Sequence, residues 1–279
     1  MLRNIVFFTF LISFVHAQEV DRLFRFPAVH KDQVVFSYAG NLYLYDLTHK
    51  HCRELTSSQG YELFPRFSPD GKWIAFTANI DGNNEVYIMP AQGGVPKRLT
   101  FTSTVLREGV GFRMGPNNIV MGWTPDGTKI IFRSREHTFN DFLGKLYTVS
   151  LSSLVEELPL PTGGFCFMSP DGTKLAYNAI FREFRTWKYY KGGMADDIRI
   201  LNLKSKEIKN ITMHASQDII PMWYGDDIFF ISDRDRTMNL FKYNLSTGHT
   251  EKLTHFTDFD IKFPSLGDGR IAFEQAGWI

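Results

Sequence analysis

Residues 68–76 read SPDGKWIAF, and this stretch decides the fold that we expect, because its pattern occurs three times in the chain. It returns as TPDGTKIIF at residues 124–132 and as SPDGTKLAY at residues 169–177. In each copy the proline presets φ at the first central position of a turn, the aspartate can bond its own backbone, and the glycine takes the left-handed position. A turn of this kind between apolar runs predicts a β-hairpin.

Each turn belongs to a larger repeated unit, which is clearest in its second copy. Residues 64–67 form an expected inner strand, residues 73–78 and 85–89 form two longer strands, and residues 97–100 form an outer strand that ends in Leu-Thr. Five complete copies begin near residues 26, 64, 107, 162 and 220, and a sixth begins near residue 263. Units of about 40–55 residues with four short strands are typical of propeller blades, whereas a sandwich or barrel would not repeat the same ordered set. We therefore expect an all-β, six-bladed β-propeller with five complete four-stranded blades and a truncated sixth.

The N-terminus has the pattern of a secretory signal peptide. Arg3 precedes an apolar run over residues 5–15, and residues 15–17, VHA, form a small-residue cleavage site. We predict a signal peptide over residues 1–17, a propeller domain over residues 18–279, and a periplasmic or secreted location; a buried first strand is the alternative. The apolar run is shorter than a bilayer-spanning helix requires, so no membrane span is expected.

Composition and charge exclude one class of partner. The chain has 31 basic and 30 acidic side chains, and removal of residues 1–17 takes away only Arg3, which leaves 30 of each. A balanced chain has no global field to attract nucleic acid or an anionic membrane.

Cys52 and Cys166 match no metal-ligand spacing, and we expect two buried free thiols, although export would permit a disulfide.

Motifs for catalysis are missing from the sequence. It contains no Gly-x-Ser-x-Gly elbow, no His-Glu-x-x-His and no phosphate-binding Gly-x-x-x-x-Gly-Lys-Ser/Thr. His49 and His51 belong to an expected exposed turn rather than to a metal site, and the turn aspartates have no surrounding ligand cluster. We therefore expect no catalytic residue, no metal and no cofactor within these residues.

Two family resemblances rest on the repeat and on one unusual segment. The repeated turn and strand resemble those of the TolB-like six-bladed propellers. Residues 182–193, REFRTWKYYKGG, resemble the R-x-x-R-T-W-K-R-Y-x-G-G segment of the first propeller of tricorn proteases, and residues 195–198 continue the likeness. Tyr189 stands where those proteins often carry a basic residue.

The tricorn resemblance implies a longer protein with a distant catalytic core. Members of that family are similar in continuing with a second propeller, helical and PDZ regions, and a serine-peptidase core that uses a Ser nucleophile, a His base and supporting Ser and Glu residues. This chain ends inside its sixth repeat, so it looks like a fragment, and no catalytic residue of the family maps onto it. The family archetype is cytosolic, which conflicts with the signal-like N-terminus.

One basic and aromatic segment is the candidate peptide-binding site. Arg182, Arg185 and Lys188 recur every third residue between the second and third strands of the fourth copy, and Arg133 and Arg135 occupy the corresponding position of the third. In a propeller these connections emerge near the channel mouth, where loops on a rigid scaffold often bind ligands. The alternative is that the aromatic residues pack the hairpin while the cations extend into water.

Three functions remain open. The first is a substrate-gating propeller of an exported tricorn-like serine peptidase, with peptides or unfolded proteins as partners and homo-oligomers formed through regions not present here. The second is a TolB-like periplasmic module that binds proteins without an attached enzyme. The third is the propeller lid of a prolyl-oligopeptidase-type hydrolase. The tricorn-like segment favours the first.

Overall fold

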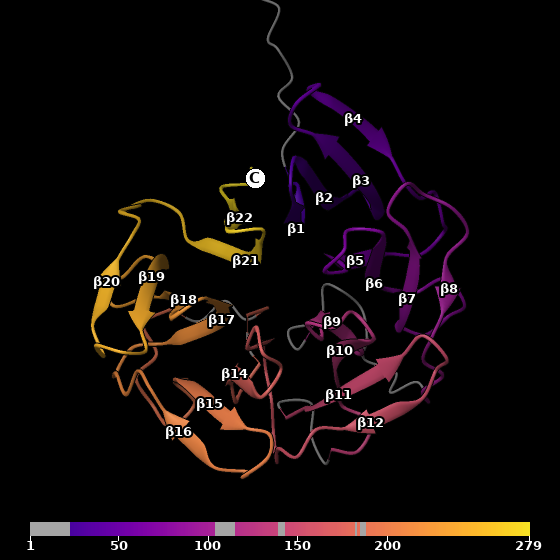
Figure 1. Ribbon diagram of the computed structural model, residues 1–279. Helices are drawn as coiled ribbons and strands as arrows, with labels where there is room; N and C mark the ends of the chain where they lie inside the picture. Colours follow the sequence, from indigo (N-terminus) through magenta and orange to yellow (C-terminus); the bar gives the residue numbers. More distant parts are fainter. Residues whose placement is uncertain (1–22, 104–114, 139–142, 182, 185–187) are drawn as a thin grey trace, which may run out of the picture.

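The computed structural model describes residues 23–103, 115–138, 143–181, 183–184 and 188–279. It contains five four-stranded antiparallel sheets and one two-stranded sheet. Figure 1 shows these sheets standing radially around a common axis, with β4, β8, β12, β16 and β20 at the outer rim. No helix is assigned in the described part of the chain, and so none there could cross a membrane. The expected β-propeller with five four-stranded blades is confirmed.

The strands follow one order in every blade, from the axis outward. Blades 1 to 3 consist of β1 (Arg25–His30), β2 (Gln33–Tyr38), β3 (Asn41–Asp46), β4 (His51–Glu54), β5 (Glu62–Phe67), β6 (Trp73–Ala78), β7 (Glu85–Pro90), β8 (Lys97–Arg98), β9 (Ile119–Trp123), β10 (Lys129–Ser134), β11 (Lys145–Ser150) and β12 (Val155–Glu157). Blades 4 and 5 and the two-stranded sheet consist of β13 (Cys166–Met168), β14 (Lys174–Asn178), β15 (Ile198–Asn202), β16 (Ile208–Asn210), β17 (Asp218–Tyr224), β18 (Asp227–Ser232), β19 (Asn239–Asn244), β20 (Thr250–Lys252), β21 (Ile261–Gly267) and β22 (Arg270–Gln275). The expected start of the third copy near residue 107 lies outside the described residues.

The outer strand of blade 2 ends two residues earlier than we expected, at Arg98, and its Leu-Thr pair explains why. Directly after β8, Leu99 N–H donates to Val86 O over 2.8 Å. The Thr100 hydroxyl then accepts a hydrogen bond from Val86 N over 2.9 Å. Thr56 and Thr254 accept the corresponding bonds in blades 1 and 5. The Leu-Thr pair thus ends the outer strand and fastens it to the third strand of its blade.

The repeated turns are held by their aspartates, as the sequence predicts. The Ser68 hydroxyl donates to Asp70 Oδ1 over 2.6 Å, and Lys72 N–H donates to the same atom over 3.1 Å. Gly71 has φ of 71°, which a residue with a Cβ adopts only under strain. The hydroxyl bond is the largest cause that lowers the pKa of Asp70 from 3.8 to about 2. The turn at Asp171 repeats these contacts, and its pKa is also lowered to about 2.

These turns should make stability depend on pH in a narrow acidic range. A carboxyl group whose pKa is lower in the folded chain stabilises it above its unfolded pKa, and that contribution is lost as pH falls. For Asp70 and Asp171 the loss should occur between about pH 4 and pH 2. We expect the double variant Asp70→Asn, Asp171→Asn to show a shallower fall in unfolding free energy over this range, measured by urea denaturation at each pH. An unchanged slope would contradict the turn assignment.

The ring closes by contact between β1 and the two-stranded sheet. Arg25 Nε lies 2.8 Å from Glu274 Oε2, and Phe26 N–H donates to Glu274 Oε1 over 2.6 Å. His30 Nδ1 lies 2.8 Å from Asp268 Oδ2. Figure 1 shows β22 beside the first blade. The count of six blades stays a prediction, because two further strands would be needed beside β22.

Both cysteines are free thiols, but only one has the expected environment. Cys166 is buried, and burial raises the pKa of its thiol. Cys52 is exposed, so the expectation of a buried thiol is wrong at this position. It lies on β4, the outermost strand of blade 1, where no further strand covers the sheet edge.

Candidate functional site

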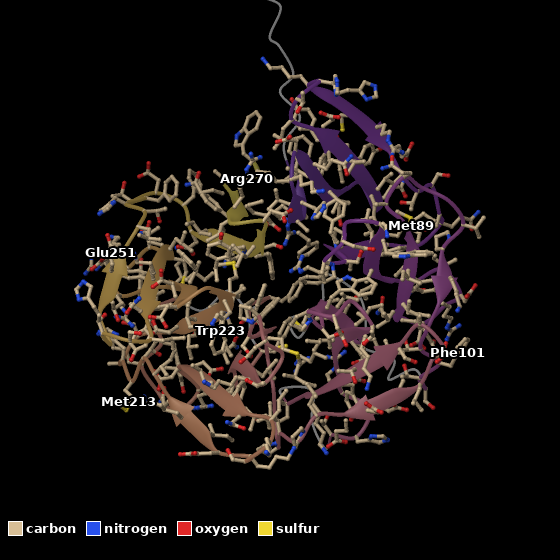
Figure 2. All side chains as sticks on the ribbon, viewed as in Figure 1. Met89, Phe101, Met213, Trp223, Glu251 and Arg270 are labelled. Carbon is tan, nitrogen blue, oxygen red and sulfur yellow. The ribbon has the colours of Figure 1, made fainter. Side chains whose placement is uncertain are left out.

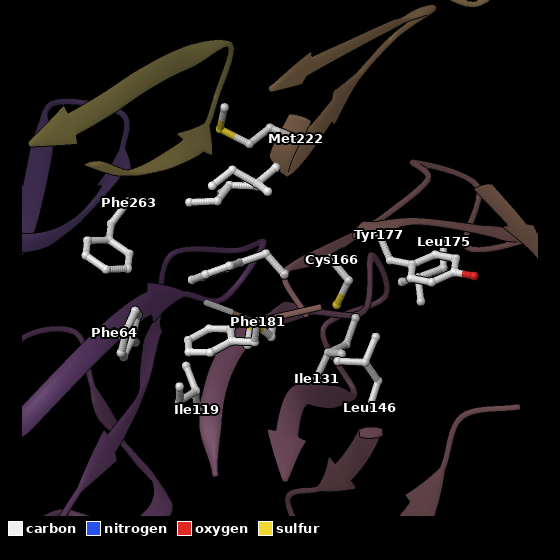
Figure 3. Packing of buried hydrophobic residues seen from close by; sticks show 14 of the residues in the cluster. Phe64, Ile119, Ile131, Leu146, Cys166, Leu175, Tyr177, Phe181, Met222 and Phe263 are labelled. Atoms are coloured by element: carbon white, nitrogen blue, oxygen red, sulfur yellow. The ribbon is translucent and has the colours of Figure 1, made fainter. Parts of the chain in front are cut away.

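The centre of the ring is filled by phenylalanine rings. Neighbouring ring centroids lie 4.1 Å apart for Phe26 and Phe64, 4.8 Å for Phe26 and Phe263, and 5.2 Å for Phe165 and Phe181. These distances fall within or near the range of favourable aromatic pairs. Figure 3 shows Phe64, Phe181 and Phe263 converging from different parts of the ring. With Phe184, whose ring centroid lies 5.4 Å from that of Phe263, these residues form what we call the axial aromatic cluster.

A repeated backbone irregularity aims part of this cluster at the axis. Phe26, Phe64, Ile220 and Phe263 each precede a proline, and their φ angles are 52°, 53°, 55° and 43°. At each of them the pairing of the inner strand with its neighbour is interrupted by a bulge. Positive φ is unusual for bulky residues and persists only where the surroundings impose it. The Pro-led inner strands that mark the repeat are therefore also the elements that close the axis.

The central axis of the propeller runs between two faces, which are formed by different connections. The turns after the inner strands, such as residues 68–71, lie on one side, which we call the turn face. The connections between second and third strands and the links between blades lie on the other side, which we call the loop face. This division follows from the strand order in each sheet. Figure 2 shows side chains reaching into the centre from the inner strands, while Phe101, Met213 and Glu251 lie at the rim.

The loop between β14 and β15, residues 179–197, contributes to the cluster from the loop face. We call this segment the blade 4 loop, and it contains the basic segment singled out from the sequence. Phe181 is fully buried and Phe184 packs against the cluster as a partly buried side chain. Lys188 Nζ lies 3.0 Å from Asp260 Oδ2, at the start of the two-stranded sheet. The described part of this loop thus lies beside the axis, whereas Arg182 and Arg185 lie outside the described residues.

A cavity of about 360 Å³ opens on the loop face beside this ion pair. Ile219, Ile220, Ile231, Ile261 and Phe263 form much of its apolar lining. Its charged lining residues carry both signs: Glu183, Lys188, Asp233, Arg236, Asp260 and Lys262. A mixed lining of this kind can hold peptide groups of either charge, but it does not select one sign.

Arg133 and Arg135 lie near the blade 4 loop but do not reach solvent. Arg133 is 1% exposed, donates from Nε to Gly163 O over 3.0 Å, and lies 4.5 Å from the centre of the Phe181 ring. Burial, followed by repulsion from Arg135, lowers the pKa of Arg133 to about 9. Arg135 is 3% exposed, and its backbone N–H donates to Asn117 Oδ1 over 2.8 Å. In this arrangement both guanidinium groups belong to the interior and cannot act as exposed steering charges.

A second cavity, of about 280 Å³, lies on the turn face of the axis. We call it the turn-face funnel. It is lined by residues of all six inner strands, and its rim and walls include five prolines: Pro69, Pro125, Pro170, Pro221 and Pro264. Ile220 lines both this funnel and the loop-face cavity. The two cavities therefore approach each other from opposite faces and are separated by the axial aromatic cluster.

Sequence reasoning missed both the cluster and the funnel. The signal for the cluster was present, because Phe-Pro occurs at residues 26–27, 64–65 and 263–264. Those pairs marked inner strands in the sequence, but their side-chain direction depends on the bulges. Nothing in the sequence marked Arg66, which lines the funnel and is 8% exposed.

Comparison with known proteins decides the family. The family model described as the tricorn protease N-terminal beta propeller domain matches residues 21–279. The chain belongs to this family. A curated relative, the tricorn protease of Thermoplasma acidophilum, is 29% identical over 280 residues, which cover 98% of this chain and 25% of the relative. The chain thus spans about a quarter of the length of that tricorn protease.

Solved structures support the family assignment and show the same fold in proteins outside the family. A crystal structure of the tricorn protease superposes with a TM-score of 0.77 at 25% identity and covers 92% of this chain and 25% of that protein. A putative TolB from Agrobacterium tumefaciens superposes with a TM-score of 0.65 at 18% identity, covering 84% of this chain and 81% of that one. At this lower identity the likeness shows the propeller fold alone.

Proposed function

We propose that this chain is the gating propeller of an exported tricorn-like serine peptidase, where it controls access of peptides or unfolded proteins to a catalytic core outside these 279 residues. Membership of the tricorn N-terminal propeller family supports the peptidase assignment. The signal-like residues 1–17 support export. The two-stranded sheet repeats the Phe-Pro bulge of blades 1 and 2, which supports its interpretation as the inner half of a sixth blade.

The observation that carries the gating proposal is the origin of the axial aromatic cluster. Phe26, Phe64 and Phe263 come from inner strands, which pair with their neighbouring strands on either side of each bulge. Phe184 instead comes from the blade 4 loop, and its ring centroid lies 6.3 Å from that of Phe26 and 6.1 Å from that of Phe64. Loops move at lower energetic cost than paired strands. A shift of the blade 4 loop would withdraw Phe184 without breaking a sheet.

The gate is tested by removing the ring that the loop supplies. We expect Phe184→Ala in the full-length protein to raise kcat/KM for long unfolded peptides several-fold, because the axis loses part of its closure. Short peptides that need no axial passage should be cleaved at the wild-type rate. The exposed Phe101→Ala at the outer rim is the matched control. Equal rates for Phe184→Ala and the wild-type enzyme on long peptides would contradict gating, and the 279-residue chain alone should cleave nothing above background.

The basic part of the blade 4 loop is proposed to steer peptides toward the loop face. Exposed charges affect association rates more than affinity, and Lys188 retains an exposed side chain despite its ion pair with Asp260. We expect the double variant Arg185→Gln, Lys188→Gln to slow peptide capture by the full-length enzyme at low salt, with the difference shrinking at high salt. Lys209→Gln on β16 is the control, since that residue is exposed at the outer rim. Capture rates unchanged at both salt concentrations would favour a packing role for this segment.

A TolB-like binding module is the second candidate. The propeller covers most of the putative TolB structure that it resembles, so the fold alone is compatible with a protein that binds partners without cleaving them. The reading frame downstream of residue 279 distinguishes the two. Continuation into PDZ and peptidase regions supports the gating proposal, and a stop after completion of the propeller supports the binding module.

A further inference from the structure

The turn-face funnel contains a buried cation that has no acidic partner in the described part of the chain. Arg66, on β5, is 8% exposed and is one of the funnel's lining residues. Its Nε donates to Met121 O over 3.3 Å and its Nη1 donates to Pro65 O over 2.8 Å. Both acceptors are neutral carbonyl groups, and among the described residues Nη2 donates no hydrogen bond and the guanidinium forms no ion pair.

No carboxylate among the described residues therefore neutralises the positive charge of the Arg66 guanidinium. Buried charges are normally paired, because removing them from water is costly. The pKa of Arg66 is lowered to about 10, and burial is its only cause, with no attraction from a carboxylate. The other titratable pair at the funnel, His30 and Asp268, is already joined across 2.8 Å. The funnel therefore presents one positive group without a carboxylate partner among mostly apolar side chains, and its other polar lining residues are Ser68, Ser265 and the His30–Asp268 pair.

The other residues that line the funnel indicate which further chemical groups a ligand needs. Beyond the five prolines, Met121, Trp123, Met168 and Met222 line the funnel. Pro69, Pro125 and Pro170 belong to exposed turns, so the mouth is open to solvent. The axial aromatic cluster closes the far end. At about 30 Å³ for each water-sized group, a cavity of about 280 Å³ holds a ligand the size of one apolar amino acid and excludes a folded chain.

We propose that the turn-face funnel binds a carboxylate carried on an apolar group, and that Arg66 receives this carboxylate. A guanidinium presents its N–H groups in a planar fork that matches a carboxylate. The apolar part of the ligand then lies against the prolines, methionines and Trp123. The carboxylate comes either from the C-terminus of a peptide that ends in an apolar residue or from a free apolar acid. The site lies on the opposite face from the loop-face cavity and does not depend on the gating proposal.

The first experiment compares acids with their neutral amides on the wild-type 279-residue chain. Isothermal titration would use N-acetyl-phenylalanine, 3-phenylpropionate and an acetylated tetrapeptide ending in leucine, each as the free acid and as the amide. We expect the acids to bind at least about tenfold more tightly than the amides, since a hydrogen bond to a charged group is lost in the amide. Binding of the tetrapeptide acid identifies a peptide C-terminus as the source. Binding of the two small acids alone identifies a free acid.

The second experiment replaces Arg66, the residue proposed to bind the carboxylate. Arg66→Met keeps the length of the side chain without its charge, and it should abolish the preference for acids while leaving the midpoint of thermal unfolding near or above that of the wild type. Arg66→Lys keeps the charge without the fork and should bind the acids with intermediate affinity. Arg53→Met, on the outer strand β4, should bind them as the wild type does. If no acid binds, if amides bind as well as acids, or if Arg66→Met keeps the preference, the proposal is wrong. The acid–amide comparison on the wild type decides it even where Arg66→Met fails to fold.

Discussion

Replacing Phe64 by alanine should lower the free energy of unfolding by about 3–5 kcal/mol, the range for deleting a buried phenylalanine ring. Phe64 is fully buried, and its ring meets those of Phe26, Phe263 and Phe184 at the axis. Its backbone φ of 53° is as unfavourable for alanine as for phenylalanine, so the substitution releases no strain. The loss is a large part of the 5–15 kcal/mol by which domains are typically stable.

A matched control separates packing at the axis from the general effect of losing a phenylalanine. Phe259 is 57% exposed, and Phe259→Ala should change the unfolding free energy by no more than about 0.5 kcal/mol. Both variants would be measured by urea denaturation at equilibrium. If Phe64→Ala costs no more than Phe259→Ala, the rings do not pack against one another, and the closed axis on which the gate depends is incorrect.

The strands could be predicted well because the same residue types recur at the same positions of each turn. The second strand of blade 2 was predicted over residues 73–78 and is observed as Trp73–Ala78. Where the prediction was less accurate, a side-chain oxygen took the place of a backbone hydrogen-bond acceptor. The outer strand predicted over residues 97–100 ends at Arg98, because Thr100 accepts the amide N–H of Val86 instead. Local sequence patterns indicate strands but not the partners that end them.

The site was less predictable, because it depends on contacts between distant segments. The basic character of Arg133 was evident in the sequence, but its burial depends on Phe181 lying across its guanidinium. The isolation of Arg66 requires that no inner strand bring an acidic side chain to it, which follows only from the arrangement of all six inner strands around the funnel. Phe184 joins the axial aromatic cluster through contacts with Phe64 and Phe263, which come from distant inner strands. None of these arrangements is marked in the sequence by a periodic pattern or a motif.

Removing the Glu85 side chain should be comparably destabilising, for an electrostatic reason. Glu85 is fully buried at the start of β7 and accepts hydrogen bonds from four neighbours. Arg98 Nη2 lies 2.9 Å from its Oε1, and Thr102 N–H donates to the same oxygen over 2.7 Å. The Thr100 hydroxyl and Asn118 Nδ2 donate to Oε2 over 2.5 Å and 3.0 Å. One carboxylate thus joins the third strand of blade 2, its outer strand, and the inner face of blade 3.

Glu85→Ala should therefore cost about 3–5 kcal/mol of unfolding free energy, the range for removing one partner of a buried ion pair. The substitution removes the buried counter-charge of Arg98, which retains the exposed Asp81 carboxylate 3.6 Å from its Nη1. It also deprives buried donors of their acceptor, whereas Glu85→Gln keeps part of the hydrogen bonding and should cost less. Glu157 provides the control, because its 2.7 Å pair with Lys145 is 40% exposed on the glutamate side and Glu157→Ala should cost only about 0–1 kcal/mol. A loss for Glu85→Ala no larger than for Glu157→Ala, measured by the same denaturation, would mean that water replaces the carboxylate. The junction between blades 2 and 3 would then be held by apolar packing alone.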